Sequence, residues 1–216
     1  MIKRQLFSVL FLLYIAILSI IFCLKWQHGS GWWESIFFDK FYVFQLMPAI
    51  ILGLAIENTH FNTFTHVRFG NRKTILKNQF LHYYERSFYF VSMTFVVMLI
   101  GSVLLSTTKE AISVWLMLDR YIHYVLGTFL FVNLMLCFQG INCAIFQRYS
   151  QLLVFLWLIF EVIILPKYVQ SHFGVSIYFA FLWIFHSGLM GYIVLLLWLM
   201  GTAFIANKLY TKRDFL

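Results

Sequence analysis

The chain has 216 residues, of which 62% are hydrophobic and only 11% are charged, and its formal net charge is +8. A soluble domain carries about 25% charged residues, so this chain has too few polar side chains to cover a surface that faces water. The same apolar content, with 26 Phe and only 2 Pro, excludes a disordered chain. We therefore predict an all-α membrane protein in which residues 1–216 form a single transmembrane domain.

Six segments are apolar enough for membrane-spanning helices, which need about 20 mostly apolar residues. We expect the first to remain as a span rather than to be removed as a signal peptide, because no small-residue cleavage site follows it. The predicted spans are residues 6–24, 41–56, 87–106, 121–143, 151–166 and 184–206.

The connections between these spans differ in character. A polar segment, 57–86, follows the second span, and 107–120 follows the third, with Trp115, Leu116 and Met117 expected at the membrane interface. Residues 144–150 are expected to form a short loop. The stretch before the last span is too long for a loop alone, so it predicts a short helical or re-entrant piece near 175–185 on the outer face.

The distribution of Lys and Arg predicts the orientation. With the N-terminus inside, 11 of the 16 basic residues lie on the cytoplasmic side, which is the positive-inside pattern of membrane proteins. An even number of spans places both termini in the cytoplasm. The basic residues expected inside are Lys3, Arg4, Arg68, Arg72, Lys73, Lys77, Arg86, Arg148, Lys208, Lys212 and Arg213, and those expected outside are Lys25, Lys40, Lys109, Arg120 and Lys167. Topology and anionic lipid thus explain the net charge without nucleic acid.

Sequence motifs of enzymes and metal sites are missing from the chain. It contains no GxxxxGK[ST], HExxH or GxSxG pattern, so we expect no catalytic residues and no ATP-binding site. His60 and His66 are six residues apart, which does not place them on one helical face. Cys23, Cys137 and Cys143 form no CxxC pair. We therefore expect neither a metal nor a cofactor in this chain.

The polar segment contains the sequence VRFGNRKTILKNQF at residues 67–80. Gly70 and Asn71 signal a turn, and Asn71 is a suitable cap for a helix that begins at Arg72. On that helix an apolar ridge forms on one face, with Lys73 and Lys77 at its edge. The ridge consists of Leu76, Phe80, Tyr83 and Tyr84. Two interpretations remain open: a basic interfacial helix that orients the protein, and a docking helix for a cytosolic partner.

A helix pair, a basic RxGxRK segment and then a long helix resemble the permeases of the ATP-binding-cassette type-2 exporter family, especially the small six-helix subunits of antimicrobial-peptide and bacteriocin transport. The C-terminal residues 212–216 have a similar basic-acidic pattern. The resemblance implies a coupling helix that sits on a separate ATPase subunit, which binds ATP and magnesium, and a second permease copy or homologue. It assigns the coupling role to Arg68, Gly70, Asn71, Arg72, Lys73, Leu76, Lys77 and Phe80.

Glu161 is an ionisable residue within the fifth predicted span. Such residues are costly in lipid and are functional candidates by default, and the alternative is a carboxyl group that is hydrogen-bonded for structural reasons. Other polar residues of the spans are expected to join neighbouring helices. They are Gln45, Asn133, Gln139 and Asn142.

Three functions are consistent with these features. The first is a permease subunit in the cell membrane, which exports an amphipathic or apolar substrate such as a peptide or a lipid. The second is a non-transporting immunity or assembly protein that binds a partner in the bilayer. The third is an intramembrane enzyme that uses Glu161 and histidines.

Overall fold

A computed structural model describes residues 9–11, 13–14, 16–17, 42–58, 72–105, 114–170, 180–186 and 188–212. Every element of these residues is a helix, as the composition predicts. The first predicted span, 6–24, lies mostly outside the described residues. The second is helical from Tyr42 to Asn58, as the π-helix η1 (Tyr42–Leu46) followed by α4 (Met47–Asn58).

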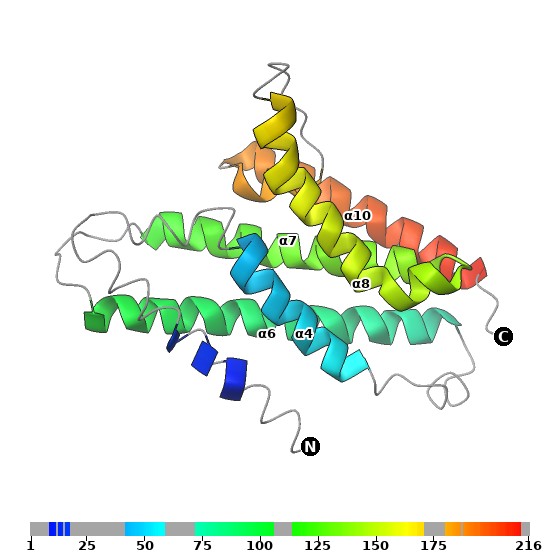
Figure 1. Ribbon diagram of the computed structural model, residues 1–216. Coiled ribbons are helices and arrows are strands. Elements are labelled where there is room, and N and C mark those ends of the chain that lie inside the picture. The colour runs from blue at the N-terminus through cyan, green and yellow to red at the C-terminus, as the bar shows by residue number, and fades with distance from the viewer. Residues whose placement is uncertain are drawn as a thin grey trace.

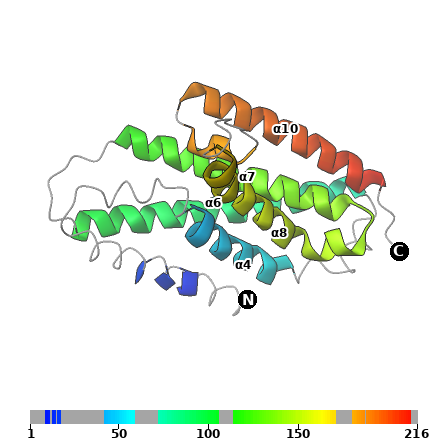
Figure 2. The same cartoon turned by 45° about the horizontal axis from the view of Figure 1, so that its top comes forward.

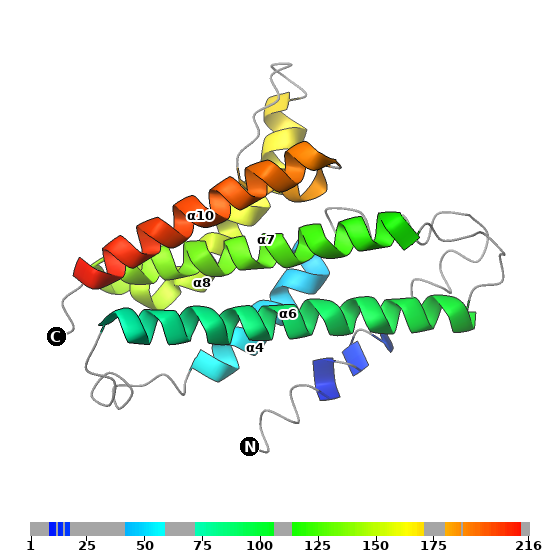
Figure 3. The same ribbon diagram turned by 180° about the vertical axis from the view of Figure 1, so that it is seen from behind.

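Three long helices lie side by side. They are α6 (Arg72–Leu105), α7 (Val114–Gly140) and α10 (Leu189–Lys212), and α7 lies between the other two (Figure 3). α6 and α7 run antiparallel, whereas α10 runs in the same direction as α7 (Figure 1). α4 and the helix α8 (Ala144–Ile159) both cross one face of this layer (Figures 1 and 2).

Three helices of the described residues are long and apolar enough to cross a membrane: Trp115–Gly140, Ala144–Tyr168 and Leu189–Lys212. The first is 61% buried within the protein, compared with 33% and 22% for the other two. α7 is therefore the central helix. α8 and α10 expose large apolar side chains, which suits contact with lipid.

The predicted helix at Arg72 begins where expected, but it does not end before the third span. It continues without a break to Leu105. The expectation of a separate coupling helix between two spans is thus corrected. The physical reason is that residues 81–87 contain neither Gly nor Pro, so nothing in the sequence stops the helix.

Two predicted loops are also helical. α7 begins at Val114, so Trp115, Leu116 and Met117 belong to a helix rather than to a loop. α8 begins at Ala144, and the turn is confined to residues 141–143, where Cys143 N donates to Ile141 O at 2.8 Å. A kink at Tyr149, with φ −109° and ψ 17°, follows within α8.

The fifth predicted span does not end at Pro166. α8 continues as the π-helix η2 (Phe160–Gln170), which contains this proline. In an α-helix the proline ring collides with the carbonyl group four residues earlier, and the wider π-helical turn relieves that collision.

The last predicted span begins five residues too early. Residues 184 and 185 belong to the 3-10 helix η3 (Leu182–Phe185), which lies within the stretch where we expect a short helical piece. Gly188 then adopts a positive φ of 104°, a conformation that glycine adopts without strain. α10 starts only after this turn and runs to Lys212.

Candidate functional site

Basic residues gather at one end of the bundle, which we call the basic end. The beginning of α6, the α7–α8 turn and the end of α10 meet there, on the right in Figure 1. The ends of α7 and α10 are in contact, because a Cβ atom placed on Gly140 would lie 2.8 Å from Leu209 Cβ. Residues of α6 and α10 also line one groove there. The basic residues of the basic end are Arg72, Lys73, Lys77, Arg148, Lys208 and Lys212, and the last four are exposed. Away from the basic end the described residues include Arg120 near the beginning of α7 and Lys167 near the end of η2, which projects from the layer of long helices (Figure 1).

A hydrogen bond fixes how far α6 extends toward the basic end. Tyr84 OH donates to Asn133 Oδ1 on α7, and the Tyr84 ring stacks on Phe129 with centroids 4.3 Å apart. At about 1.5 Å per residue, Arg72 lies about 18 Å from Tyr84 and Gly140 about 10 Å from Asn133. The first turns of α6 therefore extend past the end of α7, and Lys77 lies near the level of Gly140.

The apolar ridge predicted on α6 is not a free surface. Leu76 and Tyr83 are buried, because the apolar face of an amphipathic helix packs on neighbouring helices. Between this part of α6 and α10 lies a groove of about 260 Å³, which we call the α6–α10 groove. It is lined by Leu76, Lys77, Phe80, Leu81, Tyr84 and Asn207. This part of α6 therefore borders a hollow and does not form a protruding ridge.

Of the predicted coupling residues, the structure brings Leu76, Lys77 and Phe80 together in the α6–α10 groove. Arg72 and Lys73 form the first residues of α6. The remaining three, Arg68, Gly70 and Asn71, lie outside the described residues.

Asn133 joins three helices, as its place on a span predicts. It accepts the hydrogen bond from Tyr84 of α6, and its Nδ2 donates to Leu199 O at 3.0 Å and to Thr202 Oγ1 at 3.2 Å on α10. Nearby, Gln139 Nε2 donates to Ser150 Oγ at 3.2 Å and so connects α7 to α8. Asn142 instead is exposed in the α7–α8 turn.

Glu161 lies fully buried where α8 passes into η2. Its Oε1 accepts two backbone hydrogen bonds, from Phe181 N at 2.6 Å and from Leu182 N at 3.0 Å. Its Oε2 accepts a third, from Trp157 Nε1 at 3.0 Å. The first N–H groups of a helix lack partners within it, so this carboxylate caps the beginning of η3. This geometry fits the second interpretation of Glu161, in which its carboxyl group is hydrogen-bonded for structural reasons.

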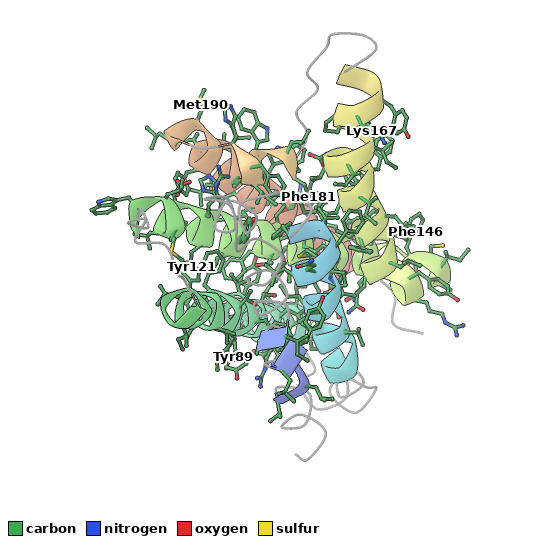
Figure 4. The ribbon with its side chains drawn as sticks, turned by 60° about the vertical axis from the view of Figure 1, so that its left-hand side comes forward. Tyr89, Tyr121, Phe146, Lys167, Phe181 and Met190 are labelled. Carbon is green, nitrogen blue, oxygen red and sulfur yellow. The ribbon has the colours of Figure 1, made fainter. Side chains whose placement is uncertain are left out.

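The segment that Glu161 holds is inserted among the helices. Figure 4 shows Phe181 toward the centre of the bundle, with Lys167 and Met190 at its periphery, and Phe181 and Ile184 are fully buried. A Cβ atom placed on Gly127 of α7 would lie 2.4 Å from Ile184 Cδ1. The glycine therefore provides the space in which η3 packs on α7.

A second polar cluster, which the sequence analysis missed, lies where α7 and α10 begin. Tyr192 OH donates to Asp119 Oδ1 at 2.6 Å, and Arg120 Nη1 donates to Phe185 O at 3.1 Å. His123 is fully buried beside them, and its ring centroid lies 4.1 Å from that of Tyr192. The spacing of Asp119, Arg120 and His123 indicates a polar cluster only if this stretch is known to form a helix.

Among the residues that the structure describes, no group of three or more His, Cys, Asp or Glu side chains is arranged to hold a metal ion. Comparison of the chain with protein-family models, with curated proteins and with solved structures gives no match. The candidate site is therefore interpreted from its own geometry.

Proposed function

We propose that this chain is the membrane-spanning permease subunit of an ATP-binding-cassette exporter, with six spans and both termini on the cytoplasmic side of the cell membrane. The observation that carries the proposal is the α6–α10 groove at the basic end, where the long helix α6 begins. A separate ATPase subunit would dock there and hydrolyse ATP. A second copy or a homologue would complete the pathway.

Docking at this place has an electrostatic and a steric component. Exposed Lys77, Arg148, Lys208 and Lys212 favour an acidic partner surface and speed its encounter. The groove accepts an apolar side chain from that partner, since Leu76, Phe80 and Leu81 line it. Leu81 is 58% exposed, so it offers apolar area at the edge of the groove.

Continuity of α6 gives the docking site a mechanical consequence. A displacement of Lys77 passes along an unbroken helix to Tyr84, and from there through Asn133 to α7 and α10. ATP-driven movement at the basic end would thus shift the packing of three helices and alternate the access of the pathway. The exported substrate would be amphipathic or apolar, a peptide or a lipid-like molecule, since the described spans carry few charged side chains.

The proposal is tested by charge reversal at the basic end. The full chain is co-expressed with a candidate ATPase subunit, and co-purification and substrate-stimulated ATP hydrolysis are measured. We expect Arg72→Glu with Lys73→Glu, and separately Lys77→Glu with Leu81→Asp, to weaken the complex about tenfold or more, as loss of one or two charge pairs and an apolar contact would.

Lys167→Glu is the matched control, because Lys167 is also exposed and basic but lies in η2, which projects away from the basic end (Figure 1). It should leave the complex intact. A complex equally strong in all three variants would contradict docking at the basic end. A stable complex without any substrate-stimulated hydrolysis would instead favour the immunity or assembly function.

A further inference from the structure

The helix α6 lies at the edge of the layer of long helices, because α7 separates it from α10 (Figure 3). Tyr84 OH donates to Asn133 Oδ1 of α7. Further along, Ser92 Oγ is hydrogen-bonded to Tyr121 OH of α7 at 2.7 Å. Glu85 directly follows Tyr84, so its level lies between these two hydrogen bonds and beside the part of α7 that is long and apolar enough to cross a membrane.

Glu85 is exposed at this level, where a charged side chain is costly unless it is paired. The described part of the structure holds no ion pair of Glu85. Arg86 is the next residue along the chain, but neighbouring residues of a helix point about 100° apart and do not face each other. A cation that pairs with this carboxylate is therefore best supplied by another helix.

A groove of about 410 Å³ runs along this exposed side of α6, and we call it the lateral groove. The described residues that line it all belong to α6, and Arg86 and Met93 are among them. Four others recur at spacings of four, three and four residues: Glu85, Tyr89, Ser92 and Val96. Positions that recur in this way form the seam between two helices of a coiled coil, and the residue that follows a seam position flanks it. The lateral groove therefore has the pattern of a contact with a second helix.

The charges of the lateral groove are complementary to those of a second copy. All copies insert into the membrane in one orientation, so a symmetric pair has its two-fold axis perpendicular to the bilayer and residues of equal depth meet. Glu85 and Arg86 differ by only about 1.5 Å in depth. Across the axis each carboxylate then faces the guanidinium group of the other chain, and two reciprocal ion pairs form.

We propose that two copies of this chain associate through the lateral groove, with α6 packed on α6 and each Glu85 paired with Arg86 of the other copy. A guanidinium group has five N–H donors, so Arg86 can bind this carboxylate in addition to its contacts within its own chain. The inference rests on the proposed function for its role, since it identifies the helix that joins the second copy. The contact itself requires neither an ATPase nor a substrate.

Charge reversal tests the ion pairs. Donor-labelled and acceptor-labelled copies of the full chain are reconstituted in liposomes, and energy transfer is measured as the ratio of lipid to protein is raised. Glu85→Arg alone and Arg86→Glu alone each place four like charges at the contact and should weaken self-association about tenfold or more. A mixture of these two variants restores both ion pairs and should associate as the native chain does. That recovery would also show that each variant is folded.

Cysteine cross-linking tests the seam without a change of charge, and so covers the case in which the reversals fail to fold. In a chain whose native cysteines are replaced by serine, Val96→Cys in liposomes should form a disulfide between two copies on oxidation with copper phenanthroline. Leu197→Cys on α10 is the matched control, since Leu197 is 58% exposed and Val96 is 52% exposed. It should cross-link about tenfold more slowly, because a disulfide requires Cα atoms within about 7 Å.

These measurements contain no ATPase and no substrate, so they judge the contact separately from export. A native chain that stays monomeric at every lipid ratio would leave the lateral groove to lipid and overturn the proposal. Single reversals that associate as the native chain does, folded reversals whose mixture does not recover, or equal cross-linking at Val96→Cys and Leu197→Cys would also overturn it.

Discussion

The carboxyl group of Glu161 shows how one buried charge can be explained at the scale of a residue. In lipid such a group is expensive unless its charge is hydrogen-bonded, and here three N–H donors converge on its two oxygens. Two of these donors are backbone groups of a segment 20 residues away in the sequence. The residue thus connects α8 and η2 to η3.

Substitution of Glu161 separates its charge from its hydrogen bonds. Glu161→Ala leaves two buried N–H groups without acceptors and should lower the free energy of unfolding by about 2–4 kcal/mol. Glu161→Gln keeps one acceptor oxygen but turns an amide donor toward Trp157, so we expect a loss of only about 1 kcal/mol. Unfolding in mixed micelles measures both values.

Trp157→Phe is the partner variant, because it removes the Nε1 donor. In that background the cost of Glu161→Gln should shrink. If Glu161→Gln abolished transport while its stability stayed near that of the native chain, the carboxylate would have a direct role in function.

At the scale of elements, two glycines on helices have opposite environments. A Cβ atom on Gly127 would approach Ile184 Cδ1 to 2.4 Å and Tyr42 OH to 2.8 Å, whereas a Cβ atom on Gly201 of α10 would meet no heavy atom within 4 Å apart from its chain neighbours and the nearby backbone of its own helix. The first position is a contact between α7 and η3. The second is an open face of α10.

Alanine at these glycines should therefore have different effects. Gly127→Ala forces Ile184 or the backbone to move and should cost about 1–3 kcal/mol in the free energy of unfolding. Ile184→Val removes the nearest atom and should recover part of that loss in the double variant. Gly201→Ala, the control, should leave stability unchanged or raise it by up to about 1 kcal/mol. Equal losses at both glycines would argue against the packing of η3 on Gly127.

At the scale of the whole molecule, the charge distribution predicts which end of the bundle faces the cytoplasm. The exposed basic residues Lys77, Arg148, Lys208 and Lys212 lie at the basic end, although they come from three separate parts of the sequence. The positive-inside rule assigns that end to the cytoplasm.

Cysteine labelling in intact cells tests this orientation. In a chain whose native cysteines are replaced by serine, Lys77→Cys and Asn207→Cys should resist a membrane-impermeant maleimide added outside. Lys167→Cys should react with it. Both basic-end variants should react once the cells are opened. Labelling of Lys77→Cys from outside in intact cells would invert the topology and remove the basis for a cytosolic ATPase partner.

The structure also shows which features of the fold local sequence patterns predict and which they do not. The helix start at Arg72 follows from turn residues, and the interhelical role of Asn133 follows from a polar side chain on an apolar span. The continuity of α6 and the helical start at Val114 were missed. Polar composition suggested a break between the helix at Arg72 and the third span, and interfacial composition suggested a loop before α7. The absence of Gly and Pro from both stretches permitted helix.

By itself the sequence determined the all-helical class, the affinity for lipid and the asymmetry of basic residues, because these depend on composition and order along the chain. Only the tertiary structure decided which polar groups meet. Glu161 finds its donors 20 and 21 residues away, and His123 faces a space beside Gly191. Such pairings depend on how helices pack against each other, and no local period in the sequence encodes that packing.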